Sequence, residues 1–197
     1  KTINSGSLVK VKMTKQPQEG QLAEAYIERT FTSGLELAYE IAISNHKIKT
    51  DWSKSVINEA NKLKLNKEED GHYKDLRDKT FVTIDGKSAK DFDDAVLGEK
   101  DKDGNYILYV AIADVARFVK QGSVIDLEAA ERGTSVYLVD RVIPMLPEVL
   151  SNDLCSLKPK VDRLCFSVIF KINSNAEILE YKISKSIIHS NKRFTYK

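Results

Sequence analysis

Two pairs of apolar segments, each joined by a short polar turn, most constrain the fold of this chain. Residues 106–113 (YILYVAIA) are aromatic, β-branched or small, and the turn at 103–104 (DG) separates them from the apolar segment 95–97. The segments 164–172 and 178–188 are separated in the same way by an NSN turn. Strand-forming segments linked by so few turn residues pair as antiparallel hairpins. The second half of the chain is therefore predicted to contain an antiparallel sheet.

One more strand and one helix complete this prediction. The segment 81–84 (FVTI) is typical of a short apolar strand. Residues 126–132 are expected to form a short helix, and Gly133 suits the left-handed position that ends many helices. We expect an α+β fold that is mainly antiparallel β-sheet with flanking helices.

The first 33 residues carry a weaker strand pattern. Apolar and polar residues alternate at 8–13 and again at 22–27, with a turn containing Pro17 and Gly20 between them. This pattern predicts two antiparallel strands. Because a two-stranded hairpin is marginally stable on its own, we interpret residues 1–33 as the end of a small β domain that begins upstream.

Helical signals follow in residues 34–74. Apolar residues in 34–43 fall at helical spacing, and Ser53 is a suitable N-cap for a second helix. The polar stretch 66–72 is typical of a linker. We therefore expect a helical linker over 34–74, followed by the N-terminal portion of a separate, truncated domain at 75–197.

Composition excludes several classes of protein but does not indicate a function. The 197 residues include 31 Lys plus Arg and 29 Asp plus Glu, a formal net charge of +2. With 42% hydrophobic residues, the chain is typical of a globular protein and not of a disordered or collagen-like one. A charge so close to zero gives no sign of nucleic-acid binding. The chain does not begin with Met, and we expect it to be a fragment.

The expected compartment is the cytoplasm. No apolar stretch reaches the ~18 residues that a membrane-spanning helix needs, so no membrane partner is expected. Cys155 and Cys165 lie ten residues apart without a C-x-x-C motif, and we predict buried thiols in a reducing environment with no disulfide partner. The three histidines are scattered, which argues against a zinc cluster or a Ser-His-Asp triad.

Four carboxylates are crowded into ten residues between two expected strands. They are Asp85, Asp91, Asp93 and Asp94. Like charges this close repel one another unless cations neutralise them, which Lys87 and Lys90 could do only in part. Oxygen-rich clusters suit a hard divalent cation such as Mg²⁺ or Mn²⁺. A solvated acidic loop is the alternative, and a calcium loop is disfavoured because the EF-hand spacing and its final Glu are missing.

From Asp75 onward the chain resembles the catalytic RNB domain of the ribonuclease II and ribonuclease R family. The matching blocks are DLRD at 75–78, the Asp85–Asp94 segment, VAIADV at 110–115, RGTSVY at 132–137, IPMLPE at 143–148, LSNDLCSL at 150–157 and VDRLC at 161–165. The first, fourth and last blocks are more similar to the ribonuclease R branch. The resemblance implies that residues 1–33 are the end of a cold-shock (OB-type) domain and that 34–74 join it to the catalytic domain.

The resemblance also implies an activity: processive 3′→5′ hydrolysis of RNA to nucleoside 5′-monophosphates with Mg²⁺ or Mn²⁺. By residue match, Asp85 and Asp94 would be the primary metal ligands, and Asp91 would support the metal site. Asp93 would be the most sensitive catalytic carboxylate. The metal ions would polarise the scissile phosphate and lower the pKa of the attacking water. The substrate would be the 3′ end of single-stranded RNA, with structured RNA as a second candidate.

Further residues fall in matching blocks. Tyr137 matches a family tyrosine that packs near the 3′-terminal bases and limits how short the final product becomes; the alternative is a buried strand aromatic. Asn152 is a second candidate for RNA binding, or it serves only its own turn. Ser156 and Asp114 could line the site or have structural roles, Asp114 as the cap of the turn after its strand.

Three functions follow from these observations. The first is a metal-dependent exoribonuclease, whose fragment is expected to be inactive alone because the rest of the domain is missing. The second is a non-catalytic RNA-binding or regulatory RNB-like module, which should have lost one or more acids of the cluster. The third is a calcium- or protein-binding β domain. Because all four acids are present, the first is preferred.

Overall fold

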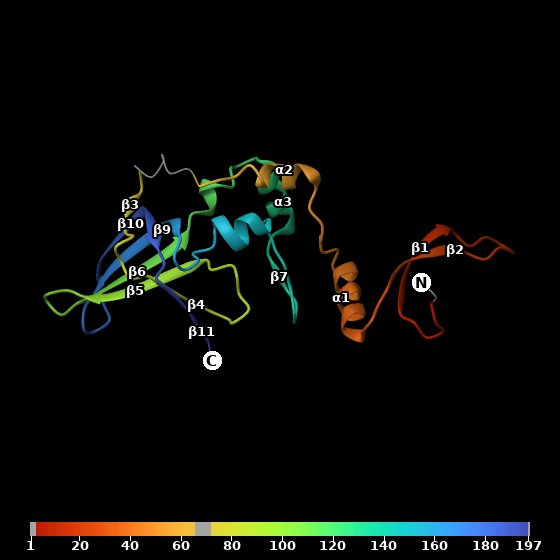
Figure 1. Ribbon diagram of the computed structural model, residues 1–197, viewed down its shortest axis with the longest axis horizontal. Coiled ribbons are helices and arrows are strands. Elements are labelled where there is room, and N and C mark those ends of the chain that lie inside the picture. Colours follow the sequence, from red (N-terminus) through yellow and green to blue (C-terminus); the bar gives the residue numbers. More distant parts are fainter. Residues whose placement is uncertain (1–2, 66–71, 197) are drawn as a thin grey trace. The chain divides into compact units, whose positions relative to one another are not determined.

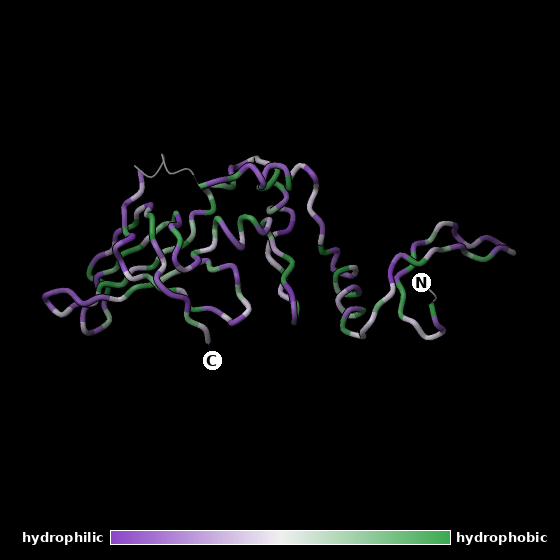
Figure 2. The backbone as a smooth tube through the Cα atoms, in the orientation of Figure 1, coloured by the Kyte–Doolittle hydropathy of each residue, from purple (hydrophilic) through white to green (hydrophobic). Residues whose placement is uncertain are grey.

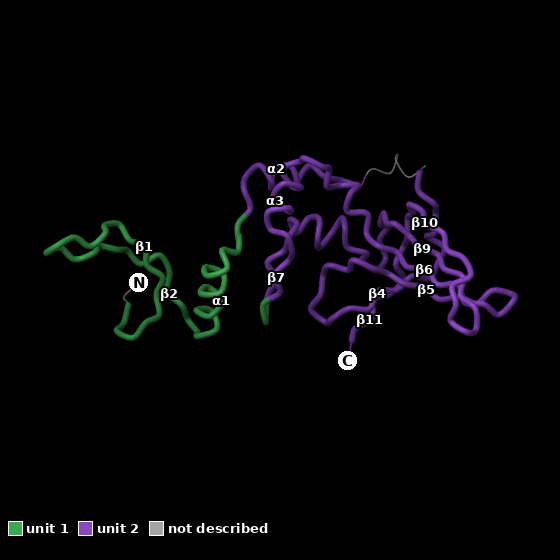
Figure 3. The backbone as a smooth tube through the Cα atoms, turned by 180° about the vertical axis from the view of Figure 1, so that it is seen from behind, with its two compact units in different colours: residues 1–51, 138–140 green, residues 52–137, 141–197 purple. Residues whose placement is uncertain are grey.

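The computed structural model describes residues 3–65 and 72–196, which divide into two compact units (Figures 1 and 3). Unit 1 comprises residues 1–51 and 138–140, and unit 2 comprises residues 52–137 and 141–197. The predicted linker stretch lies outside the described residues except for its last member, His72.

Unit 1 contains a two-stranded antiparallel sheet and one helix. Its elements are β1 (Val9–Lys15), β2 (Glu24–Thr30) and α1 (Gly34–Asn45). The strands pair as the alternating pattern predicts, with breaks in register. The helix begins after Ser33, whose hydroxyl accepts the backbone N–H of Glu36. The Glu36 carboxylate in turn accepts the N–H and the hydroxyl of Thr32. Side chains therefore satisfy backbone N–H groups both in the first turn of the helix and just before it.

Unit 2 is built on a seven-stranded sheet in the order β11-β4-β5-β6-β9-β10-β3. Its strands are β3 (Lys74–Asp75), β4 (Val82–Asp85), β5 (Asp94–Lys100), β6 (Tyr106–Ala113), β9 (Asp162–Ile172), β10 (Ile178–His189) and β11 (Lys192–Thr195). The central pairs are antiparallel, whereas the edge strands β11 and β3 pair in parallel with β4 and β10. The expected α+β fold with mainly antiparallel sheet is confirmed.

Both predicted hairpins are present. In the β5–β6 hairpin Val96 lies opposite Val110, and the turn places Gly104 at φ +84°, a left-handed conformation that glycine adopts without strain. The β9–β10 hairpin turns at Asn173, whose side-chain oxygen accepts two backbone N–H groups of the turn. Figure 2 shows these two turns as hydrophilic and much of the strand backbone beyond them as hydrophobic.

Short helices and a third hairpin complete unit 2. They are α2 (Lys54–Ala60), the 3₁₀ turn η2 (Val115–Arg117), α3 (Val124–Arg132), the β7–β8 hairpin (Val136–Tyr137 and Val142–Ile143) and the π-helical turn η3 (Leu150–Leu154). Helices α2 and α3 pack together. The predicted caps form: the Ser53 hydroxyl accepts the N–H of Val56, and Gly133 ends α3 at φ +72°. Within the described ranges, no helix has the length and apolar character to cross a membrane.

Arg132 joins three parts of this unit. Its guanidinium lies 3.5 Å above the Trp52 ring and pairs with Glu128 one turn earlier in α3. It also donates to the carbonyl of Pro144, just after β8. Since only 4% of the Arg132 side chain is exposed, these contacts fix the β7–β8 hairpin against α3 and the start of α2.

One hydrophobic core joins the sheet to the helices. Its fully buried members include Phe81, Ala111, Ile125, Leu157 and Cys165. Phe81 is the largest of them and meets the Tyr109 ring edge-on, with centroids 6.0 Å apart. Cys155 and Cys165 are free, and both are buried; the burial agrees with the prediction from sequence.

Replacing Phe81 by Ala should lower the free energy of unfolding by about 3–5 kcal/mol, because a large buried ring would leave a cavity. Urea denaturation followed by fluorescence measures the change. The matched control is Leu127→Ala on α3, whose side chain is 62% exposed and whose loss should change stability by less than about 0.5 kcal/mol. Equal effects of the two substitutions would contradict this assignment of the core.

The two thiols should not react with a disulfide reagent such as DTNB at pH 8 while the chain is folded. Burial raises the pKa of Cys155 to about 12 and that of Cys165 to about 11, so the reactive thiolate is scarce at this pH. Absorbance of the released thiolate should rise only after denaturant is added. Ser174→Cys, in the exposed β9–β10 turn, supplies a positive control that reacts at once. Rapid labelling of the unsubstituted chain would contradict the burial.

Candidate active site

The four aspartates occupy one end of the sheet of unit 2. Asp85 is the last residue of β4, and Asp94 is the first of β5. Because these strands are antiparallel neighbours, the end of one lies beside the start of the other. Asp91 and Asp93 lie in the connection between them, drawn in yellow-green in Figure 1. The antiparallel pairing of β4 and β5 therefore keeps the four aspartates of this segment together at one end of the sheet.

Burial and mutual repulsion act together on these acids. Burial raises the pKa of Asp93, and the charges of the other three aspartates raise it further. Burial also raises the pKa of Asp85, with further contributions from Asp94 and Asp91, while the positive charge of Arg193 opposes the rise. The acids are thus close enough to sense one another, and a cation bound among them would favour their charged forms.

The donor set fits a divalent metal ion. Asp85 Oδ2 is buried and accepts no hydrogen bond among the described residues, which is costly for a carboxylate oxygen. In the part of the chain that the structure describes, no three acidic, His or Cys side chains are arranged to hold one ion together. Mg²⁺ does not require three, because one or two carboxylates commonly hold it while water and substrate phosphate complete its shell.

Tyr137 reaches this cluster from the β7–β8 hairpin. Its hydroxyl donates to Asp91 Oδ2 at 2.9 Å, and this hydrogen bond, with burial of the hydroxyl, raises the pKa of Tyr137. The residue is 66% exposed, which contradicts the alternative of a buried strand aromatic. Tyr137 therefore presents a protonated hydroxyl to the acids and most of its side chain to solvent, where a planar group could stack on it.

Ser156 and Leu157 hold the segment that carries the acids. The fully buried Ser156 hydroxyl donates to the carbonyl of Lys90 at 2.7 Å and accepts the N–H of Phe92 at 3.1 Å. The N–H of Leu157 donates to the Phe92 carbonyl at 2.8 Å. These three bonds fix the backbone on both sides of Asp91. Of the two roles open to Ser156 from sequence, the structure supports the structural one.

Two other candidates, Asp114 and Asn152, form no hydrogen bond with the four acids among the described residues. Asp114 is fully buried; it caps η2 by accepting the N–H of Arg117 at 3.1 Å and also accepts the hydroxyl of Tyr73 at 2.7 Å. This confirms its predicted capping role. Asn152 is half-buried in η3, and no hydrogen bond among the described residues joins it to the four acids.

Two arginines that sequence reasoning did not assign to the site support it. Arg163, on β9, donates from Nε to the carbonyls of Asp153 and Ser156, each at 3.0 Å, and from Nη2 to the Asp153 carboxylate at 2.7 Å. Arg193, on β11, donates to the backbone just after Asp85. Arg163 lies in the matching block 161–165, whereas none of the matching blocks contains Arg193. The role of each arginine depends on pairing between strands that are distant in the sequence.

Comparison with protein families matches residues 73–197 to the RNB domain. Ribonuclease R of Escherichia coli (strain K12) is 42% identical over 195 residues, which make up 97% of this chain and 24% of that protein. Ribonuclease R of Thermotoga maritima is 51% identical over 148 residues, 74% of this chain and 21% of that protein. The chain thus spans about a quarter of the length of the curated relatives it matches.

The fold is also that of a solved relative. Mycoplasma genitalium RNase R in complex with ribose methylated single-stranded RNA is 31% identical, with a TM-score of 0.83 over 98% of this chain and 31% of that one. The same protein in complex with double-stranded RNA gives the same identity and TM-score, with 35% of that chain covered. Since the RNB domain match covers more than half of its residues, the chain belongs to the RNB domain family.

Proposed function

We propose that a protein carrying this chain is a metal-dependent 3′→5′ exoribonuclease that hydrolyses RNA processively to nucleoside 5′-monophosphates. The observation that carries the proposal is the convergence of four carboxylates at one end of the sheet, one of them with a buried oxygen that lacks a donor. Membership of the RNB family and the ribonuclease R relatives support the same reaction. Because the chain is about a quarter of those relatives, we propose that it is inactive alone.

Each acid has a proposed role. Asp85 and Asp94 hold Mg²⁺ or Mn²⁺, Asp91 supports this site, and Asp93 is the catalytic carboxylate. A metal ion held there would lower the pKa of water and stabilise charge on the phosphate. Water attacks the phosphorus of the last internucleotide linkage, and the bond from this phosphorus to the 3′ oxygen of the preceding nucleotide breaks. That oxygen takes up a proton, and a nucleoside 5′-monophosphate leaves. The raised pKa of Asp93, which desolvation and the charges of the other three aspartates produce, suits a group that accepts a proton during this step.

The proposed substrate is the 3′ end of single-stranded RNA. The exposed ring of Tyr137, next to Asp91, can stack on a terminal base of any sequence. Asn152 is proposed as a second contact to RNA. The solved Mycoplasma relative is described with single-stranded and with double-stranded RNA, which supports structured RNA as a further substrate.

Organisation and location complete the proposal. Residues 1–33 are proposed to be the end of a cold-shock domain, 34–74 a helical linker and 75–197 the first portion of the catalytic domain. A cytoplasmic location is proposed because buried free thiols suit a reducing compartment. The competing function, a non-catalytic RNA-binding module, is disfavoured because all four acids are retained and clustered.

Asp93→Asn should reduce RNA hydrolysis by about 100-fold or more while RNA binding persists, because the change removes a charge at the reacting phosphate but little volume. The measurement uses a protein of the relatives' full length that contains this chain. A 3′-end-labelled RNA is incubated with and without Mg²⁺, and labelled mononucleotide is quantified. Filter binding measures RNA affinity in parallel.

The matched control is Asp103→Asn, the same change at the tip of the β5–β6 hairpin, where the side chain is 80% exposed. It should hydrolyse RNA at the unsubstituted rate. If the unsubstituted protein releases no mononucleotide with Mg²⁺, the exoribonuclease proposal is wrong. Full turnover by the Asp93 variant would instead reject only the role given to that residue.

Tyr137→Ala should lengthen the final oligonucleotide that the protein leaves undigested. Stacking on one aromatic ring contributes about 1–3 kcal/mol per base, and short RNAs depend on it most. Gel analysis of a 5′-end-labelled RNA digested to completion gives the final length. Tyr137→Phe keeps the ring and should leave the final length unchanged. An Ala variant with the original final product would show that this ring does not hold the RNA end.

A further inference from the structure

Arg193 contacts both ends of the connection that carries the acids. Its Nη2 donates to the carbonyl of Gly86 at 2.6 Å and to that of Lys87 at 2.8 Å, at the two positions directly after Asp85. Its guanidinium carbon lies 4.9 Å from the centre of the Phe92 ring. Phe92 is 5% exposed and stands between two of the four acids.

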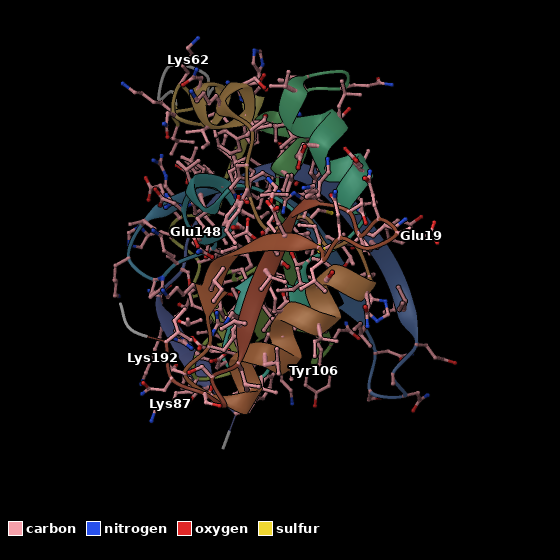
Figure 4. All side chains as sticks on the ribbon, turned by 90° about the vertical axis from the view of Figure 1, so that its right-hand side faces the viewer. Glu19, Lys62, Lys87, Tyr106, Glu148 and Lys192 are labelled. Atoms are coloured by element: carbon pink, nitrogen blue, oxygen red, sulfur yellow. The ribbon has the colours of Figure 1, made fainter. Side chains whose placement is uncertain are left out.

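The sheet holds Arg193 in this place. Strand β11 pairs in parallel with β4, with Arg193 opposite Thr83 and Thr195 opposite Asp85. The N–H of Tyr196 donates to the carbonyl of Asp85 at 3.2 Å, so the pairing continues past the end of β4. Figure 4 shows Lys87 and Lys192 at the same corner of unit 2, where the connection and β11 meet. The guanidinium is therefore presented to the acid-bearing segment by a strand that is hydrogen-bonded to β4.

We propose that Arg193 is a positioning residue that sets the distance between Asp85 and the acids that follow it, and thereby the geometry in which a divalent cation is bound. The inference rests on the proposed function in taking Asp85 as a metal ligand. Lys87 and Lys90 were expected to supply positive charge from within the segment. Arg193 supplies it from a strand much later in the chain and also fixes the backbone that separates the acids.

The charge and the geometry of Arg193 make opposite predictions for metal binding. A cation beside Asp85 repels a second cation, so removing the charge alone should tighten metal binding. Removing the contacts to Gly86, Lys87 and Phe92 frees the connection, so metal binding should weaken. The positioning role requires that the second effect be the larger one.

The test measures Mn²⁺ binding directly, by electron paramagnetic resonance of free Mn²⁺, in a protein of the relatives' full length that contains this chain. Arg193→Gln should raise the Mn²⁺ Kd by about 10-fold or more, the range seen when a residue that orients metal ligands is lost. Arg193→Lys keeps the charge and a donor but loses the planar contact with Phe92. Its Mn²⁺ Kd should therefore lie between that of the unsubstituted protein and that of Arg193→Gln. The KM for RNA at saturating metal should stay near its original value.

Lys192→Gln is the matched control. It removes one positive charge from the neighbouring residue of β11, which makes a cation–π contact with Phe194, and should leave the Mn²⁺ Kd unchanged. Circular dichroism and thermal melting establish that each variant is folded. A folded Arg193→Gln protein with a Kd at or below the original value overturns the proposal; if this variant does not fold, the same result in Arg193→Lys does so. If the unsubstituted protein binds no Mn²⁺, the metal-dependent function fails as well.

Discussion

Repulsion among carboxylates at one end of a sheet is the constraint on which this site depends. An unrestrained loop would separate its acids, since each charged carboxylate raises the cost of ionising the next. Burial raises the pKa of Asp85 and of Asp93, and the charges of neighbouring aspartates raise both further, so the folded chain keeps these acids within reach of one another. Hydrogen bonds to the loop backbone oppose the repulsion, so the acids remain clustered and a cation placed among them would be bound by a prearranged site.

The support for the acids comes from backbone contacts more than from counter-charges. Ser156 and Leu157 bond the backbone on either side of Asp91, and Arg193 bonds the backbone that follows Asp85. Arg163 in turn bonds the carbonyl of Ser156. Side chains on the strands thus hold the backbone of the connection in place, and the carboxylates of this connection need no direct ion pair to stay clustered.

The local parts of this structure are predictable from sequence, and the non-local parts are not. The β5–β6 and β9–β10 hairpins form where turn residues separate apolar runs, because both strands and the turn lie in one short segment. The crowding of the four acids is visible for the same reason. Strand β11 pairs directly with β4 although most of the sequence of unit 2 lies between them. No local pattern marks this pairing, so the role of Arg193 could not be predicted from sequence. The capping role of Asp114 is predictable from sequence because its partner is three residues away, whereas only the packing shows that Ser156 bonds the backbone of the acid-bearing segment.

Net charge conceals this organisation because several arginines of unit 2 serve the fold. Arg163 lies among carbonyls beside Asp153, Arg132 stacks on a tryptophan, and Arg77 pairs with Asp75 and Asp162. A positive charge whose donors are already engaged in this way is poorly placed to meet a phosphate, although it counts fully in the total. Four of the acids, by contrast, are gathered at one end of the sheet, where the pKa of Asp85 and that of Asp93 are raised. The near-zero sum of +2 averages over acids and bases in these different environments, which can be separated only by asking what each side chain contacts.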